Sequence, residues 1–124
     1  MQVNDDLNKM RSSCSITCAL DLVGDKWTLI IIRDALFTGA KSFGEFSASR
    51  EKIATNILTN RLDKLVSAGI FTKTRNATNK LKFDYLLTNK GLELKPILIA
   101  LGKWGCENVP GTSSMDEMLE AIKK

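Results

Sequence analysis

A change of periodicity between residues 41 and 87 limits the fold more than any other feature of this sequence. Residues 55–67 carry apolar side chains at helical spacing, so one side of the predicted helix packs and the other side stays polar. The packing side holds Ile57, Leu58, Leu62, Leu65 and Val66. Gly69 supplies the left-handed residue that ends such a helix. Residues 71–75 and 81–87 then alternate apolar and polar side chains, which is typical of strands.

A short helix at residues 42–47 precedes this segment, anchored by Phe43 and Phe46. In the second strand we expect Leu81, Phe83 and Tyr85 to share the inward face. The order helix, helix, hairpin is that of a winged helix-turn-helix. The sequence therefore predicts an α+β fold, mainly α, with a two-stranded wing and helices at both ends.

The polar side of the 55–67 helix carries side chains suited to DNA. Amides and hydroxyls pair with base edges and with phosphates, and recognition helices present their first turns to the major groove. The predicted DNA contacts of this helix are Thr55, Asn56, Thr59, Asn60, Arg61 and Lys64. Asn56, Thr59 and Asn60 are expected nearest the bases. Arg61 lies toward the packing side, where it would bind a phosphate or an internal acid.

Charge is concentrated in the same segment. Residues 41–82 hold nine basic and three acidic residues, a net charge of +6, whereas the rest of the chain holds nine basic and eleven acidic residues. A basic patch on a small domain is expected for phosphate binding, although a solvated basic face is the alternative. We expect double-stranded DNA as the partner. The predicted contacts outside the recognition helix are Lys41, Ser42, Lys73, Arg75, Asn76, Asn79, Lys80 and Lys82.

Composition argues against catalysis and against bound metal. The chain has no histidine, which removes the commonest general base, and its three cysteines have none of the paired spacings of structural zinc sites. A Cys-x-x-Cys pair and a glycine-rich phosphate loop are also missing from the sequence. We expect no enzyme activity, no cofactor and no metal. Its polar N-terminus and short apolar runs predict a cytoplasmic protein without a membrane segment.

The remaining residues predict one domain with an arm. Residues 1–13 are expected to form a flexible N-terminal arm and residues 14–124 a single domain. Asp25 is expected to cap a buried helix that starts at Lys26 and begins the core with Trp27. Helices over residues 89–124 carry more apolar surface than one small core requires, which indicates a dimer interface; packing back on the same core is the alternative. The candidates there are Leu98, Leu101, Trp104 and Leu119.

Several ordered motifs resemble those of one family. They are Cys14, the run ALDLVGDKW at residues 19–27, Phe43-x-Glu45-Phe46, ILTNRL at residues 57–62, Tyr85-x-Leu87-Thr88-x-x-Gly91 and Trp104-Gly105. Together they resemble the HxlR-type transcriptional regulators, winged-helix proteins related to the MarR group. The resemblance implies a homodimer on a palindromic operator, with the first helix, including Ile16 and Leu20, contributing to the dimer. We expect a repressor, because blocking a promoter needs fewer special contacts.

The resemblance also implies a role for Cys14, since a cysteine before the first helix senses oxidants or electrophiles in several members. A thiol at a helix start feels the positive end of the helix dipole, and Arg11 is near in sequence, so a reactive thiolate is expected. Its disulfide partner would be Cys106 or Cys14 of the partner subunit. Three alternatives stay open: an inert Cys14, a small effector held between dimer helices near Trp27, Phe37 and Trp104, and a winged helix that binds proteins without DNA.

The sequence departs from the family pattern at several positions that matter for these expectations, including residues 79–82 of the wing, where the family usually has prolines. Ser15 replaces a proline after the cysteine, and Ser42 replaces an arginine before the short helix. Ala54 stands where a serine often caps the recognition helix, so we expect Thr55 to take that capping role.

Overall fold

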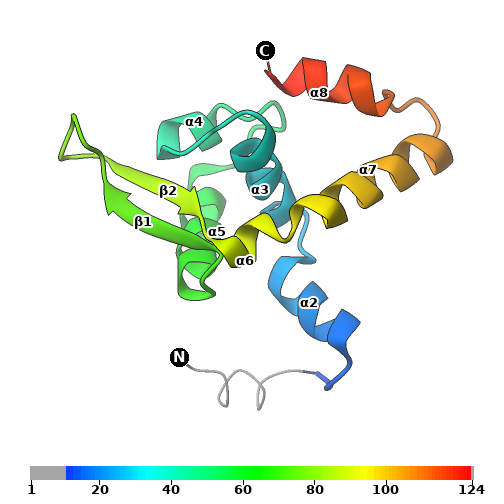
Figure 1. Cartoon of the computed structure of the whole chain (residues 1–124), viewed down its shortest axis with the longest axis horizontal. Coiled ribbons are helices and arrows are strands. Elements are labelled where there is room, and N and C mark those ends of the chain that lie inside the picture. Colours follow the sequence, from blue (N-terminus) through cyan, green and yellow to red (C-terminus); the bar gives the residue numbers. More distant parts are fainter. Residues whose placement is uncertain (1–10, 124) are drawn as a thin grey trace.

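The structure is a computed structural model that describes residues 11–123 (Figure 1). Its elements in chain order are α2 (Ser15–Val23), α3 (Thr28–Phe37), α4 (Phe43–Ser47), α5 (Thr55–Ser67), β1 (Phe71–Arg75), β2 (Phe83–Leu87), α6 (Asn89–Leu92), α7 (Lys95–Asn108) and α8 (Met115–Lys123). In chain order, helices precede and follow one antiparallel hairpin, which projects from one side of the molecule (Figure 1), as predicted for a winged helix-turn-helix. The described helices include none with the length and apolar character that a membrane span requires.

Helix α3 forms the centre of the molecule. Ile31 and Ile32 are fully buried, and each residue of α3 is at least half-buried. The helix begins at Thr28 rather than at Lys26, because Asp25 accepts hydrogen bonds from the backbone N–H groups of Trp27 and Thr28 across an intervening turn. The N-cap of α3 is therefore Trp27 rather than Asp25, and the helix starts two residues later than predicted, although the Asp25 carboxylate still accepts from backbone N–H groups at the helix start. Trp27 packs against the core as expected.

Helices α4 and α5 form the helix-turn-helix. Ser42 starts α4 with a capping box, in which its hydroxyl accepts from the backbone N–H of Glu45 while the Glu45 carboxylate accepts from the backbone N–H of Ser42. Helix α5 has the predicted bounds and buries Leu58, Leu62 and Leu65. Its N-cap is Ala54, with no side-chain cap among the described residues, so the capping role predicted for Thr55 is wrong.

Strands β1 and β2 pair antiparallel with Phe71 opposite Leu87 and Arg75 opposite Phe83. Their buried aromatic side chains join α4 to the wing: the rings of Phe46 and Phe71 pack edge to face at 5.8 Å, and each lies 6.4 Å from the ring of Tyr85. The prediction that Leu81 lies inward is wrong, because the second strand begins only at residue 83 and Leu81 is 91% exposed in the turn.

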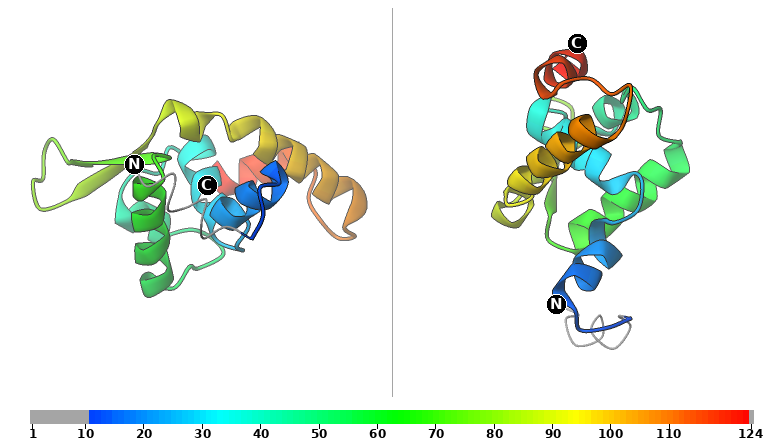
Figure 2. Two further views of the ribbon diagram at one scale, coloured as in Figure 1. Left: turned by 90° about the horizontal axis from the view of Figure 1, so that it is seen from below. Right: turned by 90° about the vertical axis from the view of Figure 1, so that its right-hand side faces the viewer.

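The C-terminal helices run from the wing across the molecule and back (Figures 1 and 2). The short helix α6 seals the end of α5, since Lys90 Nζ donates to the carbonyl of Ala68 at 2.7 Å. Pro96 lies in the first turn of α7, one of the two positions predicted for it. Helix α8 then packs on α3 and α7, with the sulfur of Met115 so close to Gly102 that an added Cβ would stand 2.8 Å away. Part of the apolar C-terminal surface therefore packs on the chain's own core.

Candidate nucleic-acid interface

The outward face of α5 presents a row of uncovered polar side chains. Thr55, Asn56, Thr59, Asn60 and Lys64 are exposed on the side opposite the buried leucines. The backbone N–H groups of the first turn have no side-chain cap within the described chain. Such groups bind phosphate readily, because the positive end of the helix dipole points at the same place. This face can therefore offer amides, hydroxyls and backbone donors to a DNA groove.

Arg61 lies apart from that row. Its Nε donates to Asp25 Oδ2 at 2.7 Å, and its Nη1 donates to Asn60 Oδ1 at 2.5 Å. Asp25 also accepts from Thr28 Oγ1 at 2.5 Å. The hydrogen bonds from Thr28 and Arg61 outweigh partial burial and lower the pKa of Asp25 to about 2. Of the two partners expected for Arg61, the structure thus shows the internal acid, which ties α5 to the start of α3.

Lys64 makes a similar link one turn later. Its Nζ donates to the backbone carbonyl of Asp21 at 3.1 Å, while the side chain remains exposed. The two basic residues therefore fix α5 against the last turn of α2 and against the turn between α2 and α3. Helix α5 is held on its packing side by the core and along one edge by these polar contacts.

The turn before α5 has its own anchor. The guanidinium of Arg33 donates to both carboxylate oxygens of Glu51 at 2.8 Å, and Glu51 also accepts from the hydroxyl of Ser49 at 3.0 Å. The bond from Arg33 lowers the pKa of Glu51 to about 2. Contacts with Glu51 and Asp34 outweigh burial and raise the pKa of Arg33. Lys52, next to this anchor, has a positive φ of 56°, which is uncommon for a residue other than glycine.

The wing carries basic side chains on an aromatic support. The ammonium of Lys73 and the guanidinium of Arg75 lie 4.4 and 5.0 Å from the ring of Phe83. Nη1 of Arg75 also donates to the carbonyl of Lys80 at 2.6 Å, which brings the two strands together near the tip. Lys80, Lys82 and Asn79 are exposed in the turn, as is Lys41 beside α4. Basic groups therefore extend from α4 along the wing.

Asn76, which the sequence predicts as a DNA contact, makes internal contacts in the wing turn. Its Nδ2 donates to the buried carboxylate of Asp84 at 3.2 Å, and its Oδ1 accepts from the backbone N–H groups of Thr78 and Asn79. Both ends of the carboxamide thus hold the turn together. Ser42 is similarly engaged as the cap of α4, although its hydroxyl can still donate.

Three exposed residues near this face were left out of the predicted contacts. Arg50 and Lys52 lie in the turn directly before α5, and Asp63 lies on its outward face. Their position in the sequence, immediately before and within the recognition helix, was the signal that could have identified them. A carboxylate at Asp63 can accept from the amino group of cytosine.

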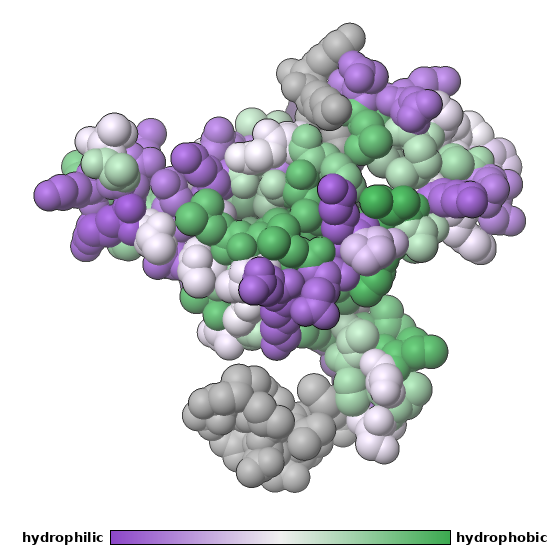
Figure 3. All heavy atoms as spheres, viewed as in Figure 1, coloured by the Kyte–Doolittle hydropathy of each residue, from purple (hydrophilic) through white to green (hydrophobic). Residues whose placement is uncertain are grey.

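A hollow near these residues lies between α4 and the wing. It has a volume of about 300 Å³ and is lined mainly by Ser42, Phe43, Leu81, Phe83 and Tyr85. Trp27, Phe37 and Trp104, the residues expected around an effector, do not line it. Space-filling atoms show hydrophilic side chains over the wing and hydrophobic ones on the surface of α2 (Figure 3). On this face the wing is thus mainly hydrophilic (Figure 3), although Leu81 and Leu86 are exposed apolar side chains within it.

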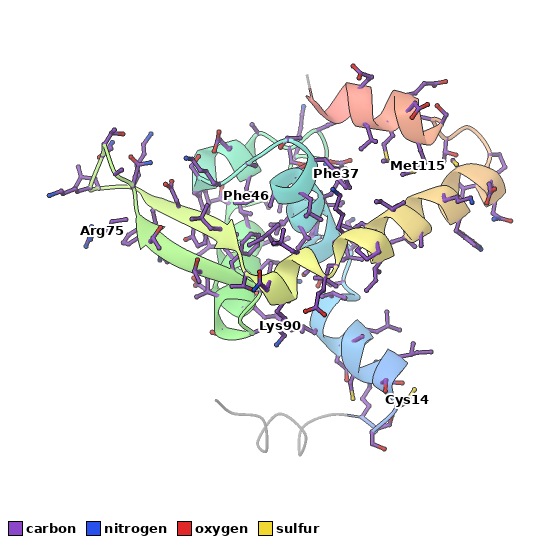
Figure 4. The ribbon with its side chains drawn as sticks, in the orientation of Figure 1. Cys14, Phe37, Phe46, Arg75, Lys90 and Met115 are labelled. Atoms are coloured by element: carbon purple, nitrogen blue, oxygen red, sulfur yellow. The ribbon has the colours of Figure 1, made fainter. Side chains whose placement is uncertain are left out.

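Cys14 lies exposed at the start of α2 (Figure 4). Hydrogen bonds from the backbone and hydroxyl of Thr17 lower the pKa of the Cys14 thiol below its usual range. Arg11, expected to assist, instead pairs with Asp21 at 2.5 Å. Residues 11–13 of the predicted arm thus lie against α2, since Ser12 also accepts from the backbone N–H of Cys14; residues 1–10 lie outside the described residues.

The other thiols do not pair with Cys14 in this chain. All three cysteines are free, and Cys106 donates to the carbonyl of Lys103. The start of α2 and the end of α7 lie apart in each view (Figures 1 and 2). The predicted bond between Cys14 and Cys106 is therefore not formed within one chain. In residues 11–123 no cluster of His, Cys, Asp or Glu could hold a metal ion.

The predicted dimer residues fall into two groups. Ile16, Leu20, Leu101 and Trp104 are between 51% and 71% exposed, so an apolar surface on α2 and α7 is uncovered. Leu98 instead packs against the core, and Leu119 is half-buried in α8, which lies on α3 and α7. The alternative of packing on the same core thus applies to these two residues.

Comparisons with known proteins agree with this geometry. A family model described as HxlR-like helix-turn-helix matches residues 22–113. An uncharacterised HTH-type transcriptional regulator of Mycobacterium bovis is 35% identical over 105 residues, which are 85% of this chain and 65% of that protein. This chain thus spans slightly less than two thirds of that relative. These matched proteins are described as transcriptional regulators rather than enzymes.

Solved structures show the same fold. PA1607, a candidate transcription factor, is 37% identical, with a TM-score of 0.75 over 85% of this chain and 73% of that one. The redox regulator HypR in its reduced form is 27% identical, with a TM-score of 0.65 over 87% of this chain and 99% of that one.

Proposed function

Because this chain belongs to the HxlR-like helix-turn-helix family, we propose that it is a sequence-specific DNA-binding repressor that acts as a homodimer and responds to oxidants or electrophiles through Cys14. One observation carries the DNA-binding part. The exposed amides and hydroxyls of α5 are fixed in place by the core and by the Asp25–Arg61 pair, next to a basic wing. A face that is both polar and rigid suits the reading of base edges, which needs donors and acceptors at set positions.

In the proposed complex α5 enters the major groove. Thr55, Asn56, Thr59 and Asn60 face base edges, and the uncapped first turn of α5 binds a phosphate. Lys41, Lys80 and Lys82 hold the phosphate backbone on either side, together with Arg50 and Lys52. Two copies related by a two-fold axis then read a palindrome, with the apolar side chains of α2 and α7 between them.

The proposed switch rests on the surroundings of Cys14. Its thiol is exposed and its pKa is lowered by Thr17, so a larger fraction is thiolate, which is the form that attacks oxidants and electrophiles. The similarity to a redox regulator supports the same role. Within the described chain Cys14 has no disulfide partner. We therefore propose that its partner is external, either Cys14 or Cys106 of a second subunit or a small thiol.

The test measures binding of the reduced protein to duplex DNA from upstream of its own gene as salt is raised. If each subunit neutralises about three phosphates, the logarithm of the binding constant should fall with log salt at a slope of about −5. The measurement is then repeated after a mild thiol oxidant. Cys14→Ser should bind as the reduced wild type does and ignore the oxidant, whereas the matched variants Cys18→Ser and Cys106→Ser should separate the roles of the other two thiols.

Each result separates one part of the proposal. If the protein shows neither sequence preference nor salt-dependent affinity for DNA, the DNA-binding role is refuted and a winged helix that binds proteins is favoured. Specific binding that ignores the oxidant in the wild type would retain the repressor and remove Cys14 as its sensor.

A further inference from the structure

Asn60 is held by Arg61 in a way that fixes which end of its carboxamide faces outward. Arg61 donates through Nη1 to one terminal atom of Asn60 and through Nε to Asp25. A guanidinium has five N–H donors and no acceptor, so the atom of Asn60 that it contacts must be the oxygen. The orientation of this carboxamide is thus set by chemistry, and Nδ2 is the end left free.

The Asp25 carboxylate keeps Arg61 in that position. It accepts from the Arg61 Nε, from the Thr28 hydroxyl and from two backbone N–H groups at the start of α3. Arg61 and Asp25 each have a side chain that is 26% exposed, so the pair is largely shielded from solvent. The chain of contacts from Asp25 through Arg61 to Asn60 therefore runs from a fixed helix start to an exposed side chain on α5.

The free end of Asn60 lies at the centre of the outward face. Residue 60 is about 160° around the helix from Leu62, at 100° per residue, and its side chain is exposed. An asparagine in the major groove can pair with adenine through both ends, its oxygen accepting from N6 and its nitrogen donating to N7. Because the oxygen is turned toward Arg61, the end of Asn60 that faces the groove is its amide nitrogen, which is a donor.

We propose that Asn60 is a specificity-determining donor that selects guanine or thymine over adenine, with Arg61 and Asp25 as its positioning residues. Guanine presents two acceptors in the major groove, O6 and N7, and thymine presents O4. Adenine presents one acceptor beside an amino group that would face the Asn60 nitrogen. This inference rests on the proposed function, since it names the bases that the same face of α5 reads.

The experiment starts with selection of binding sites from a random duplex library by the full-length protein. The position that Asn60 reads is the one whose base preference changes in Asn60→Ala. Dissociation constants are then measured with each of the four bases there. Guanine or thymine should bind best, and adenine should bind about tenfold to hundredfold more weakly. Asn60→Asp keeps the bond from Arg61 but turns an acceptor outward, so its preference should move to cytosine.

Arg61→Lys is the decisive variant. A lysine can still pair with Asp25 as a point charge, but it lacks the second arm that reaches Asn60 at the same time. The carboxamide can then turn, and the penalty for adenine should shrink to a few-fold. Loss of a merely structural contact would weaken binding to all four bases equally and leave their order unchanged.

A measurement without DNA separates failure of this inference from failure of the proposed function. In the free protein, NMR relaxation of the Asn60 side-chain amide should show a rigid group in the wild type and a mobile one in Arg61→Lys. An unchanged amide, a wild-type site with adenine at the Asn60 position, or an Asn60→Ala variant with the original base preferences would each overturn the inference. Wild-type protein that selects no sequence would refute the proposed function, while the NMR result still reports on the orientation itself.

Discussion

The molecule has two exposed surfaces of opposite character. The polar surface consists of the outward face of α5 and the wing, and its side chains are fixed by ion pairs, a core of aromatic rings and turn hydrogen bonds. The apolar surface consists of exposed side chains on α2 and α7, among them Leu20, Leu101 and Trp104. The polar surface is complete in one chain. The apolar surface leaves large side chains in water, which favours burial against a second copy.

The difference lies in what each surface requires before it can act. Exposing polar side chains to water has no free-energy cost, because water hydrogen-bonds to them. A single chain can therefore form the polar surface and hold its side chains in place. Exposed tryptophan and leucine side chains gain free energy only when something covers them. In the proposed dimer, the second subunit would cover the apolar surface, and the two-fold symmetry would set the spacing between the two polar surfaces.

Phe46→Ala should have the largest effect, because Phe46 joins α4 to both strands beneath the polar surface. Its fully buried ring packs edge to face on Phe71 and Tyr85. Removing it should lower the free energy of unfolding by about 3–5 kcal/mol, measured by urea denaturation. The matched control is Leu81→Ala, which removes an apolar side chain that is 91% exposed and should change the free energy by less than about 0.5 kcal/mol. Equal losses in the two variants would contradict this account of the core.

Trp104→Asp tests the apolar surface. Trp104 is 60% exposed, and a buried tryptophan at an interface centre contributes about 2 kcal/mol or more, so the dimer dissociation constant should rise at least about thirtyfold. Sedimentation equilibrium measures it directly. Leu81→Asp is the control, since it places the same charge on an exposed apolar side chain of the wing. If both variants stay dimeric, or if the wild type is a monomer at all concentrations, the apolar surface is not the dimer interface.

Glu51→Gln tests whether the turn before α5 is held by charge. Arg33 lowers the pKa of Glu51 from 4.5 to about 2, so the carboxylate stabilises the fold above its unfolded pKa of about 4.5. That stability is lost as pH falls from about 4.5 through 2. Allowing for solvent screening, the wild type should exceed Glu51→Gln by about 1 kcal/mol at pH 7. Urea denaturation at several pH values should show the gap closing between pH 4.5 and 2; a constant gap would mean that charge plays no part.

A feature of this structure could be predicted from the sequence when the residues that cause it lie close together in the chain. The 55–67 helix was predicted with its observed bounds because its apolar spacing and Gly69, with φ of +78°, are local signals. The inward position of Leu81 was wrong because the start of a second strand depends on pairing across the turn. Asn76 and Asp84 make that turn eight residues apart, and alternation alone does not reveal it.

Contacts between distant residues account for the remaining differences. Arg61 and Asp25 are 36 residues apart, so the sequence could place Arg61 on the packing side but could not decide between an internal acid and a phosphate. For the same reason, the sequence could not decide whether the C-terminal apolar residues pack on the chain's own core or form a dimer interface. Packing of α8 on α3 buries part of that surface within the chain, and the apolar spacing alone does not reveal which helix covers it.

Replacement of a single lysine on the wing should have the smallest effect of the changes considered. Comparing it with a lysine on α7 tests whether the polar surface, rather than the overall charge, binds DNA. Lys80 lies exposed at the wing tip, and Lys103 lies exposed on α7, the helix that carries much of the apolar surface. If Lys80 contacts a phosphate, Lys80→Ala should reduce the slope of log binding constant against log salt by about 1 per contact, and it should weaken binding to all DNA sequences alike. Stability should change by less than about 0.5 kcal/mol, because the side chain is exposed.

Lys103→Ala is the control. It removes the same charge from the whole protein, so it corrects for the effect of net charge on long-range attraction. If the slope of log binding constant against log salt changes equally in the two variants, DNA binding depends only on the overall charge of the protein. The wing would then not contact DNA.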